Sequence, residues 1–262
     1  MTAGRDAPLT TVDLAREAIV LAGAGAAILL QVAHRPVGAG VVRHSGFVAD
    51  PVRRLRHTLQ YVYATVLPEA AGARDAMAAA VRSAHRPVEG TDAGGRPYAA
   101  GDPRAQLWVA ATLYAVAEEV RWRVWGTLEA GPAEAIYRDY AVLGTLLGMP
   151  ASAWPADRAG FRRYWTDAVG ALEVTDDARA LCRDLFAGAA APWWLRRVLP
   201  LARFTAAGLL PHPVRTALGL DWDGADSRRE DRLWRAVRAV YPRLPRGLRR
   251  LPARLVVRGL PS

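Results

Sequence analysis

Lysine is absent from the 262-residue sequence, and all 35 basic residues are arginine. A Schiff base on a lysine amine and the lysine-containing phosphate loop of P-loop nucleotidases are therefore excluded. Cysteine is almost absent too, because Cys182 is the only one. One cysteine allows no internal disulfide, no CxxCH cofactor-attachment motif and no cysteine cluster for zinc. We expect Cys182 to be a small buried residue in a cytoplasmic protein.

Motifs for several common chemistries are missing as well. The sequence has no HExxH, no Glu-x-x-His pair and no Asp-rich loop, so we expect no dedicated zinc, di-iron or calcium site. It also lacks the GxSxG motif of hydrolases. Gly23-x-Gly25-x-x-Ile28 departs from the dinucleotide fingerprint at its third position, and no βαβ pattern surrounds it. We interpret the two glycines as places where a neighbouring helix or a flat ring approaches the backbone.

The residues that are abundant are typical of helices. Ala and Leu dominate, hydrophobic residues make up 52% of the chain, and strand-like alternation of Val, Ile and Thr is nearly absent. We predict an all-α fold with a single globular multi-helix domain. The apolar run Ala18–Leu30 has 13 residues, fewer than the roughly 20 that span a bilayer. We expect it to form a helix at the centre of the core, capped by Thr10 or Thr11.

Two Asp-Pro pairs mark helix starts. In Asp50-Pro51 and Asp102-Pro103 the aspartate can cap the helix and the proline can take its first position. Helices are expected from 52 to 63 and from 106 to 125, and an Ala-rich run predicts another from 73 to 84. Glycines favour a looser segment from 37 to 50 and a loop from 89 to 101. Ser227–Glu230 matches a capping box.

Positive charge is concentrated near the C-terminus. Residues 1–189 contain 20 Arg and 20 acidic residues, whereas residues 190–262 contain 15 Arg and 5 acidic residues. We predict a helical domain over 1–189 and a basic, Trp/Arg-rich helical extension over 190–262 that packs on it. Without a recognition helix, RNP motif or zinc finger, no nucleic acid partner is expected. Trp193, Trp194, Arg196 and Arg197 fit peripheral contact with a membrane surface, although a solvated face is the commoner role of such residues.

The strongest candidate site combines a histidine with a polar helix face. His85 ends the Ala-rich helix directly before a Gly/Asp loop. Arg54, His57, Thr58 and Tyr61 are spaced by three and four residues, so they share one helix face. From the residues alone, a histidine at a helix end is more often structural than a ligand. His34 also lies near a helix end, because Pro36 disfavours helix at Arg35.

Several sequence blocks, taken together, resemble one known family. They are Leu30–Pro36, Val41–Ser45, Asp50–Thr58, Val81–His85 and Tyr98–Leu113. In order and spacing they are similar to the haem-dependent oxygenases that include the rubber-cleaving latex-clearing proteins and the ER-bound oxygenase of mycophenolic acid biosynthesis.

The resemblance implies a globin-like helical pocket that holds haem b without a covalent link. It assigns His85 as the proximal iron ligand, and Arg54 and Thr58 as catalytic and cofactor-binding residues beside the haem. His57 takes the place of a lysine that can be the sixth iron ligand in latex-clearing proteins, so the resemblance makes it a catalytic candidate that either binds the iron or lines the distal pocket. His34 matches the catalytic His-Pro block, with Arg35 interposed.

The activity that the resemblance implies is O₂-dependent oxygenation of a hydrophobic substrate, such as an isoprenoid small molecule or polymer. Ala110 stands where relatives often have histidine. A haem-binding or sensing protein without oxygenase turnover is therefore an alternative. A non-enzymatic helical protein at a membrane surface is a further one, suggested by Trp193 to Arg197.

Overall fold

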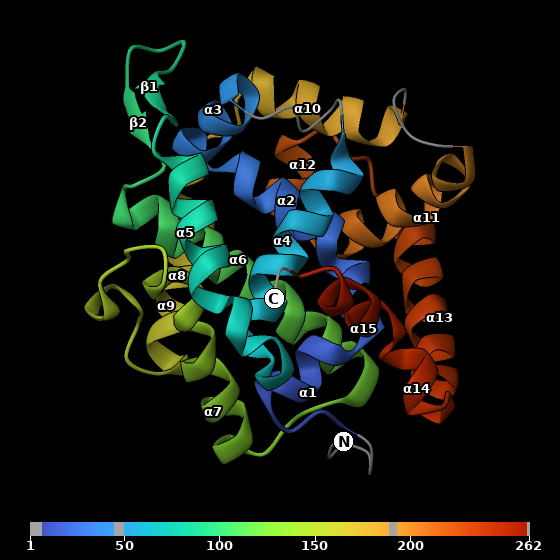
Figure 1. Ribbon diagram of the computed structural model, residues 1–262. Coiled ribbons are helices and arrows are strands. Elements are labelled where there is room, and N and C mark those ends of the chain that lie inside the picture. The colour runs from blue at the N-terminus through green and yellow to red at the C-terminus, as the bar shows by residue number, and fades with distance from the viewer. Residues whose placement is uncertain (1–6, 45–49, 189–192, 261–262) are drawn as a thin grey trace.

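The computed structural model describes residues 7–44, 50–188 and 193–260. Within these ranges nearly all regular structure is helical, which confirms the predicted all-α single domain (Figure 1). The first helices are α1 (Thr11–Arg16), α2 (Ala24–Ala33), α3 (Arg35–His44), α4 (Pro51–Val66), α5 (Arg74–His85), α6 (Pro103–Trp125), α7 (Ala130–Tyr140) and α8 (Val142–Thr145). The likeness to globins stays a prediction.

The second half of the chain continues in the same way. Its helices are α9 (Arg158–Gly170), α10 (Asp176–Ala187), α11 (Trp193–Leu209), α12 (His212–Ala217), α13 (Gly224–Val240), α14 (Arg246–Arg249) and α15 (Leu251–Arg258). Short 3₁₀ helices are η1 (Ala18–Gly23), η2 (Pro68–Ala73), η3 (Ala151–Ala153) and η4 (Tyr241–Arg243). Strands β1 (Glu89–Thr91) and β2 (Pro97–Ala99) form an antiparallel hairpin inside the predicted loop.

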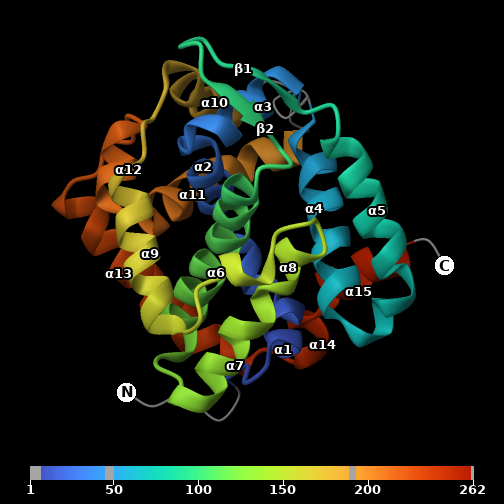
Figure 2. The same ribbon diagram turned by 90° about the vertical axis from the view of Figure 1, so that its left-hand side faces the viewer.

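The two Asp-Pro pairs begin helices as predicted. The carboxylate of Asp50 accepts a hydrogen bond from the amide of Arg53, and that of Asp102 accepts one from the amide of Arg104. Each bond satisfies an amide that the first turn leaves without a helical partner. These caps fix the start of α4 and α6, and α6 runs through the middle of the molecule (Figure 2).

The predicted continuous N-terminal helix is wrong, because it breaks at Glu17. Glu17 has an extended backbone, with φ −78° and ψ 117°, between α1 and η1. The hydroxyl of Tyr241 donates to the Glu17 carboxylate and accepts from the amide of Ile19. Tyr241, far away in the sequence, therefore provides hydrogen-bond partners for the Glu17 carboxylate and the Ile19 amide next to the break. The apolar run still reaches the core, since Leu29 and Leu30 of α2 are fully buried.

The looser segment expected from 37 to 50 is also wrong over its first part, which is the helix α3. Pro36 occupies the first turn, where proline is tolerated. Gly38 and Gly40 are buried. A Cβ at Gly38 would overlap the carbonyl of Val32, and one at Gly40 would lie 3.1 Å from Val88. These glycines allow close helix packing rather than a turn.

Gly23 and Gly25 serve helix packing too. A Cβ at Gly23 would overlap Val116 of α6, and one at Gly25 would lie 2.9 Å from Cβ of Ala206 on α11. Of the two interpretations of these glycines, approach of a neighbouring helix is confirmed. Neither glycine lines the cavity described below.

The C-terminal segment contributes to the same core as the rest of the chain. One buried cluster joins Leu29 and Trp108 with Leu210, Trp234 and Tyr241. The predicted boundary at residue 189 lies outside the described residues, so it stays a prediction. The predicted capping box at Ser227 is wrong: Asp223 and Asp226 form the box that begins α13, and Glu230 is buried against Arg123.

Among the described residues, no single helix combines the length and apolar character needed to cross a membrane. The segments Ala18–Ala33 and Arg35–His44 meet that test only when taken together, and they are bent by 103° where they join.

Candidate functional site

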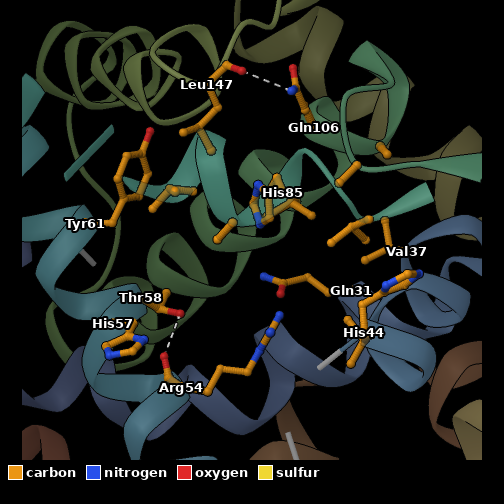
Figure 3. Close-up of a pocket in the computed structure, with 18 of the residues that line it drawn as sticks. Gln31, Val37, His44, Arg54, His57, Thr58, Tyr61, His85, Gln106 and Leu147 are labelled. Atoms are coloured by element: carbon orange, nitrogen blue, oxygen red, sulfur yellow. Dashed lines mark hydrogen bonds between the residues drawn. The ribbon is translucent and has the colours of Figure 1, made fainter. Parts of the chain in front are cut away.

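A cavity of about 730 Å³ lies between α2, α3, α4, α5, α6 and the hairpin. This volume is within the usual range for sites that bind small molecules and cofactors. Apolar side chains form much of its wall, including Val37, Met77, Val109, Leu113 and Leu147. Figure 3 shows polar side chains around it from α2, α3, α4, α5 and α6.

His85 lies on the cavity wall contributed by α5. Met77, Val81 and Ala84 share its helix face, so the same stripe places the imidazole at the cavity. No hydrogen bond joins His85 to another described residue. His85 is exposed, and it lies on the wall of the cavity. Burial, followed by the charge of Arg54, lowers the pKa of His85 below 6.5, so its ring is neutral at pH 7 with a lone pair available.

The predicted polar face of α4 lines the same cavity. Arg54, His57, Thr58 and Tyr61 all contribute to the wall. Arg54 extends into the cavity (Figure 3). Burial lowers the pKa of its guanidinium, but the ordinary pKa of arginine is so high that the group stays charged.

The hydroxyls on this face already have partners. Thr58 donates to the carbonyl of Arg54 at 3.1 Å, and Tyr61 donates to the carbonyl of Leu143 at 2.8 Å. Burial raises the pKa of Tyr61 to about 12. In Figure 3 the ring of His57 lies beyond Thr58 as seen from His85. His57 and His85 thus line one cavity without facing each other.

His34 is separate from the other predicted site residues. It follows α2, and its ring stacks on Trp108 with centroids 5.6 Å apart. It does not line the cavity. Burial lowers its pKa, while the charge of Asp102 acts in the opposite direction. Its Nδ1 is buried and has no hydrogen-bond partner among the described residues.

Two features of the wall did not emerge from the sequence. Gln31 of α2 enters the cavity, and it is the one polar residue in the run Ala18–Ala33. That isolation in an apolar helix is the signal that could have identified it. At the hairpin end, His44 Nε2 and the Tyr98 hydroxyl are 3.0 Å apart.

Ala110 also lines the cavity and is 2% exposed.

These side chains fit haem better than a bare metal ion. Among the described residues, no group of three or more His, Cys, Asp or Glu could hold a metal. Haem needs only one or two protein ligands, because its ring supplies the others. A neutral histidine on an apolar wall matches that need, and the half-buried charge of Arg54 suits a propionate carboxylate.

The comparisons with known proteins show the family to which the chain belongs. The family model described as ER-bound oxygenase mpaB/B'/Rubber oxygenase, catalytic domain, matches residues 13–240. The chain therefore belongs to this oxygenase family, and at that coarse level it is an oxidoreductase. No solved structure matches it.

Two mycobacterial relatives are similar over most of their length. They are Mb2261 of Mycobacterium bovis and Rv2237 of Mycobacterium tuberculosis, each 35% identical over 224 residues. The match covers 83% of this chain and 87% of each relative. Both relatives are described as uncharacterized proteins.

Proposed function

We propose that this protein is a haem b-dependent oxygenase that acts with O₂ on a hydrophobic substrate. One observation carries the proposal: His85, which has no hydrogen bond to any described residue, lines a largely apolar cavity of about 730 Å³ into which Arg54 extends. Family membership supports an oxygenase. Haem, when bound, supplies O₂ binding and electron transfer.

The residues of the chain would each act on this cofactor in a different way. His85 would supply a nitrogen ligand to the haem iron, and its lowered pKa favours the unprotonated ring at neutral pH. Arg54 would pair with a propionate. Thr58 holds the carbonyl of Arg54 and so steadies that turn of α4. His57 lines the same cavity, but its ring does not face His85, so we propose that it lies beside the cofactor rather than binding the iron.

The cavity wall supports a hydrophobic substrate. Val109 and Leu113 of α6 line it beside Val37 and Leu147. Such a surface excludes water and favours burial of hydrocarbon, at about 25 cal/mol per Å². We propose a substrate of isoprenoid type, either a small molecule or a polymer.

Absorption spectroscopy tests the cofactor directly. We expect the protein to take up haem b with a Soret band, and His85→Ala to lose most of it. Free imidazole should restore binding to His85→Ala, because it replaces the missing ligand. His212→Ala, which changes a histidine of α12 that does not line the cavity, is the matched control. Full haem uptake by His85→Ala would contradict the assignment.

Turnover separates an oxygenase from a haem sensor. The oxygenase should consume O₂ with an isoprenoid substrate and yield a product of increased oxygen content. Ala110, at the position where the family resemblance implies a histidine, lines the cavity. A haem-loaded protein that consumes no O₂ with any isoprenoid, but does so as Ala110→His, would favour the sensor.

We also propose that α11 contacts an anionic membrane surface. Trp193 is 73% exposed, and Val198 and Leu201 farther along α11 are exposed as well. The guanidinium of Arg197 lies 5.8 Å from the centre of the Trp193 ring, an arrangement that suits the headgroup region. The side chain of Trp194 lies outside the described residues.

Vesicle flotation tests this contact without deleting a core segment. Trp193→Ser with Leu201→Ser should lose binding to vesicles that contain anionic lipid. Trp122→Ser, which changes another exposed tryptophan on α6, should retain it. Equal flotation of all variants would remove the proposal.

A further inference from the structure

Gln31 stands out because it is a polar side chain in an otherwise apolar segment. The run Ala18–Ala33 contains no other polar residue. Polar side chains within a core usually have a specific partner. In Figure 3, Gln31 and Arg54 extend from α2 and α4 into the cavity on the side that faces His85.

The neighbouring Thr112 fixes the orientation of the Gln31 amide. Thr112 is fully buried, and its hydroxyl donates to the carbonyl of Val109 at 2.7 Å. That oxygen can then only accept, so Nε2 of Gln31 must be the donor in their 3.2 Å contact. Oε1 of Gln31 and one remaining N–H are left to interact with a ligand.

Other polar groups on the wall are already engaged within the chain. The Thr58 and Tyr61 hydroxyls donate to backbone carbonyls, and the amide of Gln106 donates to the carbonyl of Leu147. His44 pairs with Tyr98. Gln106 also keeps a buried Oε1 without a partner among the described residues, but in Figure 3 it lies beyond His85 as seen from Gln31. Gln31 is therefore the glutamine whose remaining hydrogen-bonding capacity faces His85 from the opposite wall.

We propose that Gln31 hydrogen-bonds the small ligand that binds on the cofactor face opposite His85. This inference rests on the proposed haem function. A ligand on that face carries negative charge on its outer atom, which can accept the free N–H of Gln31. The surrounding apolar wall strengthens such a bond, because water does not compete for it. Thr112 is a positioning residue that holds the amide.

Carbon monoxide and azide probe this contact without any turnover. Infrared spectroscopy of the ferrous CO complex reports a donor near the outer atom through the C–O stretching frequency. We expect Gln31→Leu to raise that frequency. Azide affinity of the ferric protein should fall about five- to tenfold, the worth of one hydrogen bond. Gln31→Glu, which loses the N–H, should behave like Gln31→Leu in the CO measurement.

Two further variants give the inference its controls. Thr112→Val keeps the shape of the side chain but releases the amide, so the C–O band should broaden or split. Gln106→Leu makes the same chemical change at a glutamine whose amide is tied to Leu147, and it should leave the C–O band in place.

The outcomes distinguish this inference from the function on which it rests. A parent protein that takes up no haem overturns both. Normal haem uptake with an unchanged C–O band and azide affinity in Gln31→Leu overturns only the role of Gln31. A band shift in Gln31→Leu, absent in Gln106→Leu, supports it.

Discussion

The carboxylate of Glu17 and the imidazole of His85 lie in regions that are built differently. Glu17 is 3% exposed and accepts a hydrogen bond from Tyr241 at 2.9 Å. The guanidinium of Arg249, 2% exposed, lies 3.5 Å from it as an ion pair. His85 has no hydrogen bond to any described residue and faces a cavity. We call the surroundings of Glu17, Tyr241 and Arg249 the closed region, and the cavity wall around His85 the hollow region.

The contrast shows how one helical chain separates stability from function. In the closed region, Glu17 joins the N-terminal segment to η4 and α14, so its contacts stabilise the fold. In the hollow region, polar side chains keep bonding capacity that the fold does not need. Substitutions should therefore affect stability in the first region and ligand binding in the second.

Removal of Glu17 should have the largest effect on stability. Glu17→Ala leaves Arg249 buried without its partner, and we expect the free energy of unfolding to fall by about 3–5 kcal/mol. Chemical denaturation measures this. Glu69→Ala is the control, because its pair with Arg16 is partly exposed and should contribute less than about 1 kcal/mol. Equal losses in the two variants would contradict the distinction between regions.

A methyl group added at Gly23 should have the next largest effect. Its Cβ would overlap Val116 of α6 in the packed core, and overpacking of this kind costs about 1–3 kcal/mol. Thermal unfolding of Gly23→Ala should therefore begin at a lower temperature. Gly72 has open space around it, so Gly72→Ala should retain the parent's stability. A stable Gly23→Ala would show that η1 and α6 can move apart.

The sequence predicted those parts of the fold that depend on local signals. The caps Asp50 and Asp102 act on amides within their own first turn, so α4 and α6 begin as expected. The break at Glu17 depends on Tyr241, 224 residues away. No local pattern reveals such a partner. From the sequence, Gly38 is typical of a turn. Its actual role, to leave space for the carbonyl of Val32, is apparent only in the folded structure.

In the candidate site, too, the residues set by local spacing were predictable, and those set by helix packing were not. The spacing of Arg54 and Thr58 placed them on one helix face, and the family resemblance linked that face to His85. All three line one cavity. His34 could not be assigned this way, because the 103° bend after α2 decides which side it faces. Gln31 was missed for the same reason: its direction depends on how α2 packs.

A large side chain in the hollow region should change stability little but block binding. Ala84 lies beside His85 on the cavity wall. We expect Ala84→Phe to keep the unfolding free energy within about 0.5 kcal/mol, while haem uptake falls at least tenfold because the ring fills the cavity. The same change at the fully buried Ala26 should destabilise the fold. Normal haem uptake by Ala84→Phe would argue against binding next to His85.

The smallest expected effect concerns the pH dependence of the cofactor-free protein. Burial and the charge of Arg54 hold the pKa of His85 below its ordinary value near 6.5. The unfolded chain therefore binds this proton more readily, and stability falls as the pH drops below 6.5 toward the folded pKa. Arg54→Ala removes one cause and raises the folded pKa toward 6.5, so the stability lost between pH 7.5 and pH 5.5 should be smaller than in the parent.

Two measurements make this last comparison decisive. NMR titration should show a higher His85 pKa in Arg54→Ala, and denaturation at the two pH values should show the smaller loss. Arg53→Ala is the matched control, because Arg53 pairs with Asp50 at 3.5 Å and is not a cause of the His85 shift. An unchanged His85 titration in Arg54→Ala would mean that the guanidinium does not act on His85 across the cavity.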